Sequence, residues 1–160
     1  MNIILVEGID GAGKTTFIKN LTNIAHRVKI AHFTADDVKK FPDPVQRYYD
    51  LLATCSVAGY DTVILDRGWY SDLVYGRVLR NAEEITWDQI RIIERMCSGY
   101  GNLTIFKVTT QVATAWKRCK ERGENLIENA KQLKDLAAEY AAVFAFTESA
   151  SPATIYEVRT

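Results

Sequence analysis

The chain has 160 residues, of which 48% are hydrophobic and 25% are charged, which is the size and balance of one globular domain. Lys and Arg total 20, and Asp and Glu also total 20; the resulting zero net charge argues against nucleic-acid binding through bulk charge. Three cysteines without a CxxC pair exclude a disulfide framework, and with only two histidines the sequence gives little support to a zinc site.

The chain begins MNIILVEGID, with four consecutive apolar residues and no preceding basic region. This pattern is typical of neither a signal peptide nor a membrane span. We therefore expect a cytoplasmic protein without a membrane partner. The oligomeric state is left open, with a homodimer among the assemblies that the sequence allows.

Short apolar runs alternate with segments of helical periodicity along the whole chain. The predicted strands are 3–6, 28–33, 62–65, 103–108 and 153–158, and the predicted helices are 14–24, 44–58, 69–80, 87–99, 112–122 and 126–146. Pro44 at a first helical position and a capping box opening at Thr86 support two of the helix starts. The order predicts an α/β fold: a five-stranded parallel sheet with helices on both faces, formed by a single domain over 1–160.

Residues 8–15 read GIDGAGKT and match the phosphate-loop pattern GxxxxGK[ST] in full. Such a loop follows a strand and opens a helix, and its backbone N–H groups converge on phosphate oxygens. The pattern predicts that Lys14 contacts the β- and γ-phosphates and that the hydroxyl of Thr15 binds Mg²⁺. The predicted ATP-binding residues are Gly8, Gly11, Ala12, Gly13, Lys14, Thr15 and Thr16.

The third predicted strand ends in Asp66, followed directly by Arg67. Parallel sheets bind ligands at the carboxyl ends of their strands, so Asp66 is expected on the magnesium side of the phosphate loop. A guanidinium beside the metal favours a second bound anion, such as the phosphate of an acceptor. The alternative is an ordinary charge pair at a strand end.

Two segments carry a family resemblance. Residues 7–16, EGIDGAGKTT, resemble the phosphate loop of the thymidylate kinases, and residues 66–75, DRGWYSDLVY, resemble the DR(Y/H)xxSxxAY motif of that family. The segment 41–43, FPD, is similar to the F-P segment of the same family. The resemblance implies the nucleoside monophosphate kinase fold and ATP-dependent phosphoryl transfer to a deoxynucleoside monophosphate.

The resemblance also implies roles for individual residues. Asp10 would contact the acceptor sugar or help to place its phosphate, and Arg67 would grip that phosphate. Asp66 would hold Mg²⁺ through water, while Ser71 and Tyr75 would line the acceptor pocket. Phe41 would either stack on the base or belong to the core. Gly68 and Gly76 depart from the family pattern and leave the identity of the base open.

Residues 115–124 read AWKRCKERGE and contain four basic side chains. Arg118 and Arg122 are one helical turn apart, so they share a helix face. The segment resembles the basic lid of the thymidylate kinases, and we expect a lid over about 115–125 whose arginines stabilise the transferring phosphoryl group. The alternative is a solvated basic helix end. The predicted catalytic residues are Lys14, Asp10, Arg67, Arg118 and Arg122.

The sequence thus predicts a nucleotide kinase with ATP and Mg²⁺ as cofactors and a small-molecule nucleotide as substrate. One alternative is a deoxynucleoside kinase, in which Asp36, Asp37 or Asp66 would act as general base. Another is a kinase of a modified base or a 5′ end in DNA, which the zero net charge disfavours. A nucleotide-dependent switch is disfavoured because no NKxD guanine-binding motif is present.

Overall fold

The computed structural model describes residues 1–123 and 126–160. Five parallel strands form one sheet in the order β2-β3-β1-β4-β5. The strands are β1 (Asn2–Glu7), β2 (Val28–Ala31), β3 (Thr62–Asp66), β4 (Asn102–Thr109) and β5 (Thr154–Arg159). The predicted five-stranded parallel α/β sheet is confirmed.

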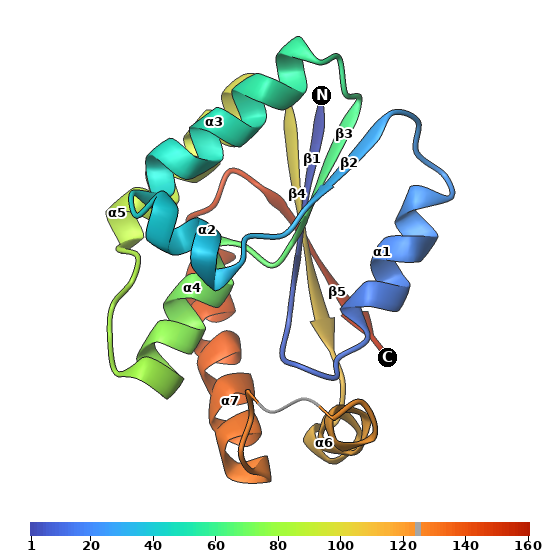
Figure 1. The fold of residues 1–160 in the computed structure, drawn as a ribbon, viewed down its shortest axis with the longest axis vertical. Coiled ribbons are helices and arrows are strands. Elements are labelled where there is room, and N and C mark those ends of the chain that lie inside the picture. Colours follow the sequence, from blue (N-terminus) through green and yellow to red (C-terminus); the bar gives the residue numbers. More distant parts are fainter. Residues whose placement is uncertain (124–125) are drawn as a thin grey trace.

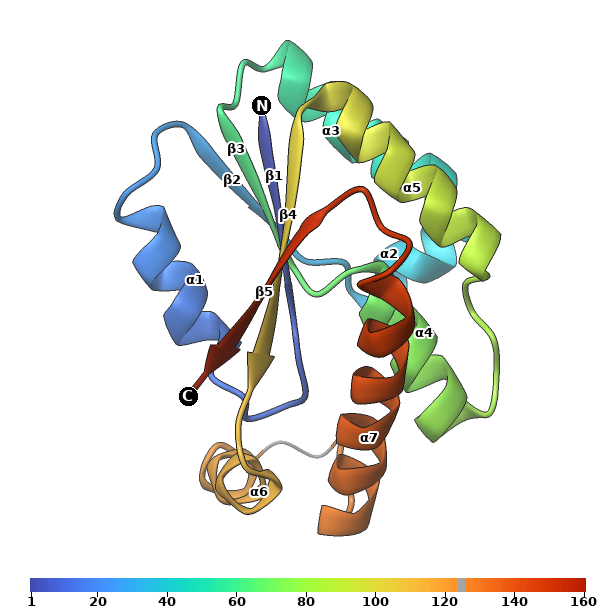
Figure 2. The same cartoon turned by 180° about the vertical axis from the view of Figure 1, so that it is seen from behind.

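Helices cover both faces of this sheet (Figures 1 and 2). They are α1 (Lys14–Thr22), α2 (Ala35–Lys40), α3 (Pro44–Val57), α4 (Trp69–Tyr75), α5 (Trp87–Tyr100), α6 (Val112–Glu121) and α7 (Ala130–Thr147). In both views α1 lies on one face, whereas α3, α4, α5 and α7 lie on the other. The helix α6 lies beyond the carboxyl ends of the strands, beside the loop that joins β1 to α1.

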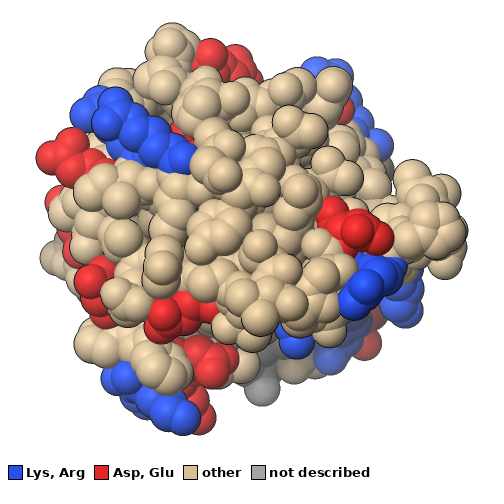
Figure 3. Space-filling view, turned by 90° about the horizontal axis from the view of Figure 1, so that it is seen from above, with Lys and Arg blue, Asp and Glu red and all other residues tan. Residues whose placement is uncertain are grey.

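The central strands are buried because helices cover them on both sides. Leu5 of β1 lies in register with Leu65 of β3 and Ile105 of β4, and all three side chains belong to the buried core. Around the opposite end of the molecule, where the strands begin, basic and acidic groups alternate at the rim of a largely uncharged surface (Figure 3). Among the described residues, this face therefore shows no concentrated basic patch.

Local signals explain most helix boundaries. The Asp43 side chain accepts a hydrogen bond from the backbone N–H of Val45 and caps α3, whose first residue is Pro44. The Thr86 side chain caps α5 and completes a capping box with Gln89, as predicted.

Two predicted helices differ in extent from the structure, and one helix was missed. The segment 69–80 is not one regular helix, because α4 ends at Tyr75 and a π-helical turn, η1, covers Gly76–Arg80. At Gly76 the chain returns so closely that an added Cβ would lie 2.6 Å from the carbonyl oxygen of Ala82. The last helix starts at Ala130 rather than 126, since Asn129 caps it. The helix α2 was not predicted at all.

Candidate active site

The phosphate loop joins β1 to α1 and is built on backbone that only glycine adopts readily. Gly8 has φ 149°, Gly11 has φ 75° and Gly13 has φ 93°, all in the range that disfavours other residues. An added Cβ on Gly8 would lie 2.2 Å from the carbonyl oxygen of Val108, and one on Gly11 would lie 2.3 Å from that of Ala115. The loop is therefore packed directly against the end of β4 and against α6.

Lys14, the first residue of α1, folds back over this loop. Its ammonium donates hydrogen bonds of 2.8 Å to the backbone carbonyls of Gly8 and Ile9. Burial, followed by the neighbouring charge of Arg67, lowers the pKa of Lys14 to about 7. A bound phosphate would supply the negative charge that favours the protonated form, so Lys14 is suited to hold an anionic ligand at the loop.

The other side of the loop holds Asp10, Arg67 and Tyr75. The guanidinium of Arg67 donates to the Asp10 carboxylate at 2.5 Å and to the carbonyl of Gly8 at 3.0 Å. The Tyr75 hydroxyl donates to the second Asp10 oxygen at 2.6 Å, and its ring centroid lies 4.8 Å from the Arg67 guanidinium carbon. The side chains of Arg67 and Asp10 are only 19% and 16% exposed.

This arrangement keeps Asp10 ionised. Burial by itself would raise the pKa of the Asp10 carboxyl, but the charge of Arg67 and the Tyr75 hydroxyl lower that pKa overall. Burial raises the pKa of Tyr75, which keeps this hydroxyl protonated. Arg67 has five N–H donors in all, so donors remain beyond the two contacts with Asp10 and Gly8.

A cleft of about 270 Å³ opens beside these groups. It is lined by the predicted substrate residues Arg67, Ser71 and Tyr75, by the predicted metal ligand Asp66, and by His32, Phe33, Tyr48, Gly68, Asp72, Arg80 and Leu126. The Ser71 hydroxyl, however, is hydrogen-bonded to the carboxylate of Glu7 and lies 2.6 Å from the Tyr140 hydroxyl. Ser71 therefore lines the cleft while its hydroxyl is engaged inside the protein.

The structure does not bring Phe41 to this cleft. Its side chain is 45% exposed and lines a separate cavity of about 460 Å³ beside α3. The reason is the unexpected helix α2, which ends at this residue. Arg47 then holds the backbone carbonyl of Phe41 at 3.0 Å, while the Lys40 ammonium lies 5.4 Å from the Phe41 ring centroid.

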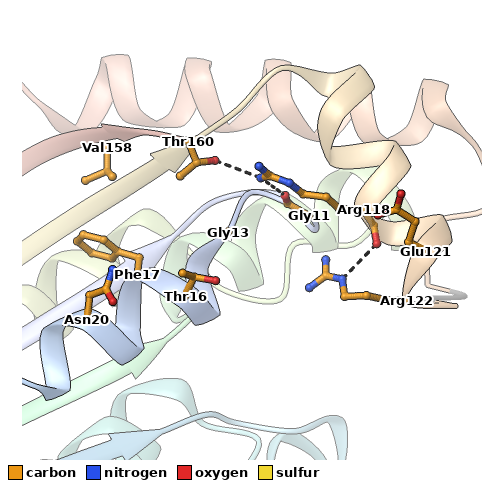
Figure 4. Close-up of a pocket in the computed structure, with 10 residues that line it drawn as sticks. All are labelled: Gly11, Gly13, Thr16, Phe17, Asn20, Arg118, Glu121, Arg122, Val158 and Thr160. Carbon is orange, nitrogen blue, oxygen red and sulfur yellow. Dashed lines mark hydrogen bonds between the residues drawn. The ribbon is translucent and has the colours of Figure 1, made fainter.

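The predicted lid arginines lie on α6 at the other end of the loop, where Figure 4 shows both lining a cavity of about 500 Å³. Arg118 donates to the carbonyl of Gly11 at 3.0 Å and to the Thr160 hydroxyl at 3.2 Å. The guanidinium Nε of Arg122 donates to the carbonyl of Arg118 at 3.3 Å. Residues 124 and 125 of the predicted lid lie outside the described residues.

That cavity has both apolar and polar walls. Its lining comprises Gly11, Gly13, Thr16, Phe17, Asn20, Arg118, Glu121, Arg122, Val158 and Thr160. The sheet order places it on the β5 side of the phosphate loop, whereas the cleft of Arg67 lies on the β2–β3 side. The loop thus stands between two separate hollows.

The donor set at the loop fits Mg²⁺. Asp66, at the end of β3, is in register with Val6 of β1, so its carboxylate borders the loop, and the exposed Thr15 lies in the first turn of α1. Mg²⁺ in such enzymes takes one or two protein oxygens and completes its shell with substrate phosphates and water. Along 1–123 and 126–160, no three His, Cys, Asp or Glu side chains form a metal-binding group.

Sequence reasoning missed several groups at this site. His32 follows β2, and its Nδ1 lies 2.8 Å from the backbone carbonyl oxygen of Asp66. Glu7 is completely buried beside Ser71, and Tyr140 of α7 shares that cluster. The one signal in the sequence was Glu7 itself, because a carboxylate at the end of a buried strand needs hydrogen-bond partners.

The fold and the loop together define an α/β phosphate-loop (P-loop) NTPase fold. The sequence model of the polyphosphate kinase 2 family (PPK2) matches residues 2–140. The chain belongs to this family, and it is a phosphotransferase of the nucleotide kinase class. The comparisons do not single out the thymidylate kinases within that class.

Solved structures share the fold. The YorR protein from Bacillus subtilis, in complex with phosphorylated GDP, is 22% identical with a TM-score of 0.75, covering 98% of this chain and 85% of that one. Deoxyadenosine kinase from M. mycoides, with dCMP and dCDP, is 15% identical with a TM-score of 0.61, covering 98% and 89%. No curated protein matches the chain. Across the described residues, no helix is both long and apolar enough to span a membrane.

Proposed function

We propose that this chain transfers the γ-phosphoryl group of ATP, in the presence of Mg²⁺, to a deoxynucleoside monophosphate and releases ADP and the corresponding diphosphate. The observation that carries the proposal is the placement of Arg67. Its guanidinium is held at the edge of a cleft, next to the phosphate loop and on the side away from the lid arginines. A fixed guanidinium there is suited to an acceptor phosphate.

The two hollows give the two substrates opposite approaches. A donor phosphate chain over Gly11, Gly13 and Lys14 would come from the α6 side, and an acceptor in the cleft would come from the β3 side. Phosphoryl transfer needs the attacking and leaving oxygens roughly in line with the phosphorus between them. Lys14 would neutralise charge on the transferring group, and Mg²⁺ held by Thr15 and Asp66 would supply further charge neutralisation.

The family name raises polyphosphate as an alternative donor, and the cavity beside α6 favours a nucleotide. Phe17 and Val158 provide apolar walls and Asn20 a polar group, a combination that suits a nucleobase. A long polyphosphate would instead need an extended basic track, and Glu121 lies among the arginines here. We therefore propose ATP as the donor.

A donor and acceptor screen tests this proposal. The common ribo- and deoxynucleosides and their monophosphates are each incubated with Mg²⁺ and either ATP or polyphosphate, and the products are separated by chromatography. Diphosphates formed from deoxynucleoside monophosphates with ATP are the expected result. Turnover with polyphosphate but not with ATP would contradict ATP as the proposed donor. Turnover of nucleosides but not of their monophosphates would contradict the proposed acceptor.

A deoxynucleoside kinase is the second candidate, because the cleft contains groups able to take a proton from a hydroxyl acceptor. Asp66 and His32 both line it. Asp36 and Asp37, also predicted as bases, do not. The Asp37 carboxylate accepts from the backbone N–H of Thr34 in the capping box of α2, and Asp36 pairs with Lys39 on the surface. Monophosphates formed from nucleosides in the same screen would favour this candidate.

A further inference from the structure

Glu7 is the last residue of β1 and immediately precedes the phosphate loop, and its carboxylate is buried. An ionisable group that is completely buried destabilises a fold unless hydrogen bonds compensate it. One oxygen of Glu7 accepts from the backbone N–H groups of Gly68 at 3.0 Å and Ser71 at 3.1 Å. The other accepts from the hydroxyls of Ser71 and Tyr140.

These contacts replace the missing cap of α4. The residue before this helix is Gly68, which has no side chain to bond the first helical N–H groups. In a capping box, one side chain accepts from the third helical residue and another accepts from the residue before the helix. Glu7 does both with a single oxygen from a neighbouring strand, because Ser71 and Gly68 occupy those two positions.

Between β3 and this helix stands Arg67, whose backbone has φ 69°, a conformation unfavourable for a residue with a side chain. Its N–H donates to the carbonyl of Val6 at 3.0 Å, and the next N–H, of Gly68, donates to Glu7. Val6 and Glu7, two successive residues of β1, thus fix the backbone N–H groups of Arg67 and Gly68. This backbone in turn directs the guanidinium back to Gly8 and Asp10.

We infer that Glu7 is a positioning residue that sets the guanidinium of Arg67 relative to the phosphate loop. It acts through the backbone of residues 67 and 68 and touches no substrate. The inference rests on the proposed function, in which Arg67 holds the acceptor phosphate. Since Glu7 and Gly8 are adjacent, the residue that fixes the acceptor arginine is also joined covalently to the donor loop.

The test compares Glu7→Ala with Glu94→Ala. Glu94 is the matched control, because it is also buried and accepts a 2.5 Å hydrogen bond from Tyr70 of the same helix α4, away from the phosphate loop. Glu7→Ala should raise the acceptor KM about 10–100-fold, the effect of a misplacement near 1 Å, with the donor KM changed less than about threefold. Glu94→Ala should leave the ratio of the two KM values unchanged.

Two further variants show whether Glu7 acts through Arg67. Glu7→Gln keeps an oxygen that can accept from both amides, so it should restore the acceptor KM to within about threefold of wild type. In a double-mutant cycle, Glu7→Ala should add little to Arg67→Lys, because both changes impair the same contact. Equal effects on both substrates, an equal effect of Glu94→Ala, or full additivity would overturn the inference.

If Glu7→Ala does not fold, Tyr140→Phe provides the measurement, since it removes one hydrogen bond to Glu7 and keeps the ring. The acceptor KM should then rise about 3–10-fold, as expected for one lost hydrogen bond, and an unchanged acceptor KM would overturn the inference. Arg67→Lys alone separates the two proposals. Without a selective effect on the acceptor, the proposed role of Arg67 fails; with one, but none for Glu7, only the positioning inference fails.

Discussion

The arginines on the two sides of the phosphate loop are bound to the protein in different ways. On the side proposed for the acceptor, Arg67 is largely buried and joined to Asp10 by an ion pair. On the side proposed for the donor, Arg118 is half-buried and bonds a backbone carbonyl and a threonine hydroxyl, and Arg122 is exposed. The proposed acceptor side is therefore held in place by the protein itself, whereas the proposed donor side has contacts that a substrate can replace at small cost.

The largest effect is expected at the group that both sides share. Lys14→Ala should lower kcat/KM by at least about 10³-fold, since phosphoryl-transfer sites depend on positioned cations for most of their rate. Thermal melting should show a folded protein of similar stability, because the buried ammonium is itself poorly solvated. Turnover within tenfold of wild type, by steady-state kinetics, would remove Lys14 from the site.

The next largest effect concerns the predicted lid. Truncating whichever of Arg118 and Arg122 reaches the transferring phosphoryl group should lower kcat by about 10²–10⁴, the size of arginine-finger effects. The Kd for ATP alone should change little, because Arg118 and Arg122 already donate to backbone carbonyls of the protein. Steady-state rates and calorimetry on Arg118→Ala and Arg122→Ala check this prediction. Near-normal kcat in both variants would indicate a solvated basic helix end.

Donor binding should weaken as pH rises. With a pKa of about 7, Lys14 loses its proton above that pH, and the ATP Kd should rise about 15-fold between pH 7 and 8.5 by proton linkage. The free energy of unfolding should instead rise with pH between about 7 and 10.5, because the unfolded chain keeps this proton over that range and the folded chain does not. Calorimetric titrations should lose the pH dependence in Lys14→Met; an unchanged profile there would assign it to another group.

A smaller effect is expected from filling the space at Gly68. An added Cβ would lie 2.7 Å from a methyl carbon of Leu5 and 3.2 Å from the Tyr48 hydroxyl. Gly68→Ala should destabilise the fold by about 1–3 kcal/mol, the usual range for overpacking, and should raise the acceptor KM more than the donor KM. Denaturant unfolding together with kinetics measures both quantities. A larger rise in the donor KM would contradict the division of the loop into two sides.

Most of the fold could be predicted because its signals are local. The apolar strands, the phosphate loop, the Pro44 helix start and the capping box at Thr86 each lie within a few residues of sequence. The helix α2 has a capping box too, but its third residue is Asp37 rather than Glu or Gln. That shorter side chain hid the signal of α2, and Phe41, whose role was implied by the family resemblance alone, follows the last residue of this helix.

The residues of the site likewise divide into those that the sequence could predict and those that it could not. Asp66 and Arg67 could be assigned to one cleft because parallel strands present their carboxyl ends at one edge. The partners of Glu7 could not be predicted, since Ser71 and Tyr140 lie 64 and 133 positions away in the sequence. Such contacts arise only when β1, α4 and α7 are packed together.

The central claim, that Arg67 holds an acceptor phosphate, is tested most directly by the acceptor preference of Arg67→Lys. Lysine keeps the charge but loses the fork that bonds two phosphate oxygens. The KM for the deoxynucleoside monophosphate should rise about 10–100-fold, the cost of losing a charge-assisted hydrogen bond, while the ATP KM stays within about threefold. Equal rises for both substrates, or equal activity of the wild type on nucleosides and their monophosphates, would contradict the account.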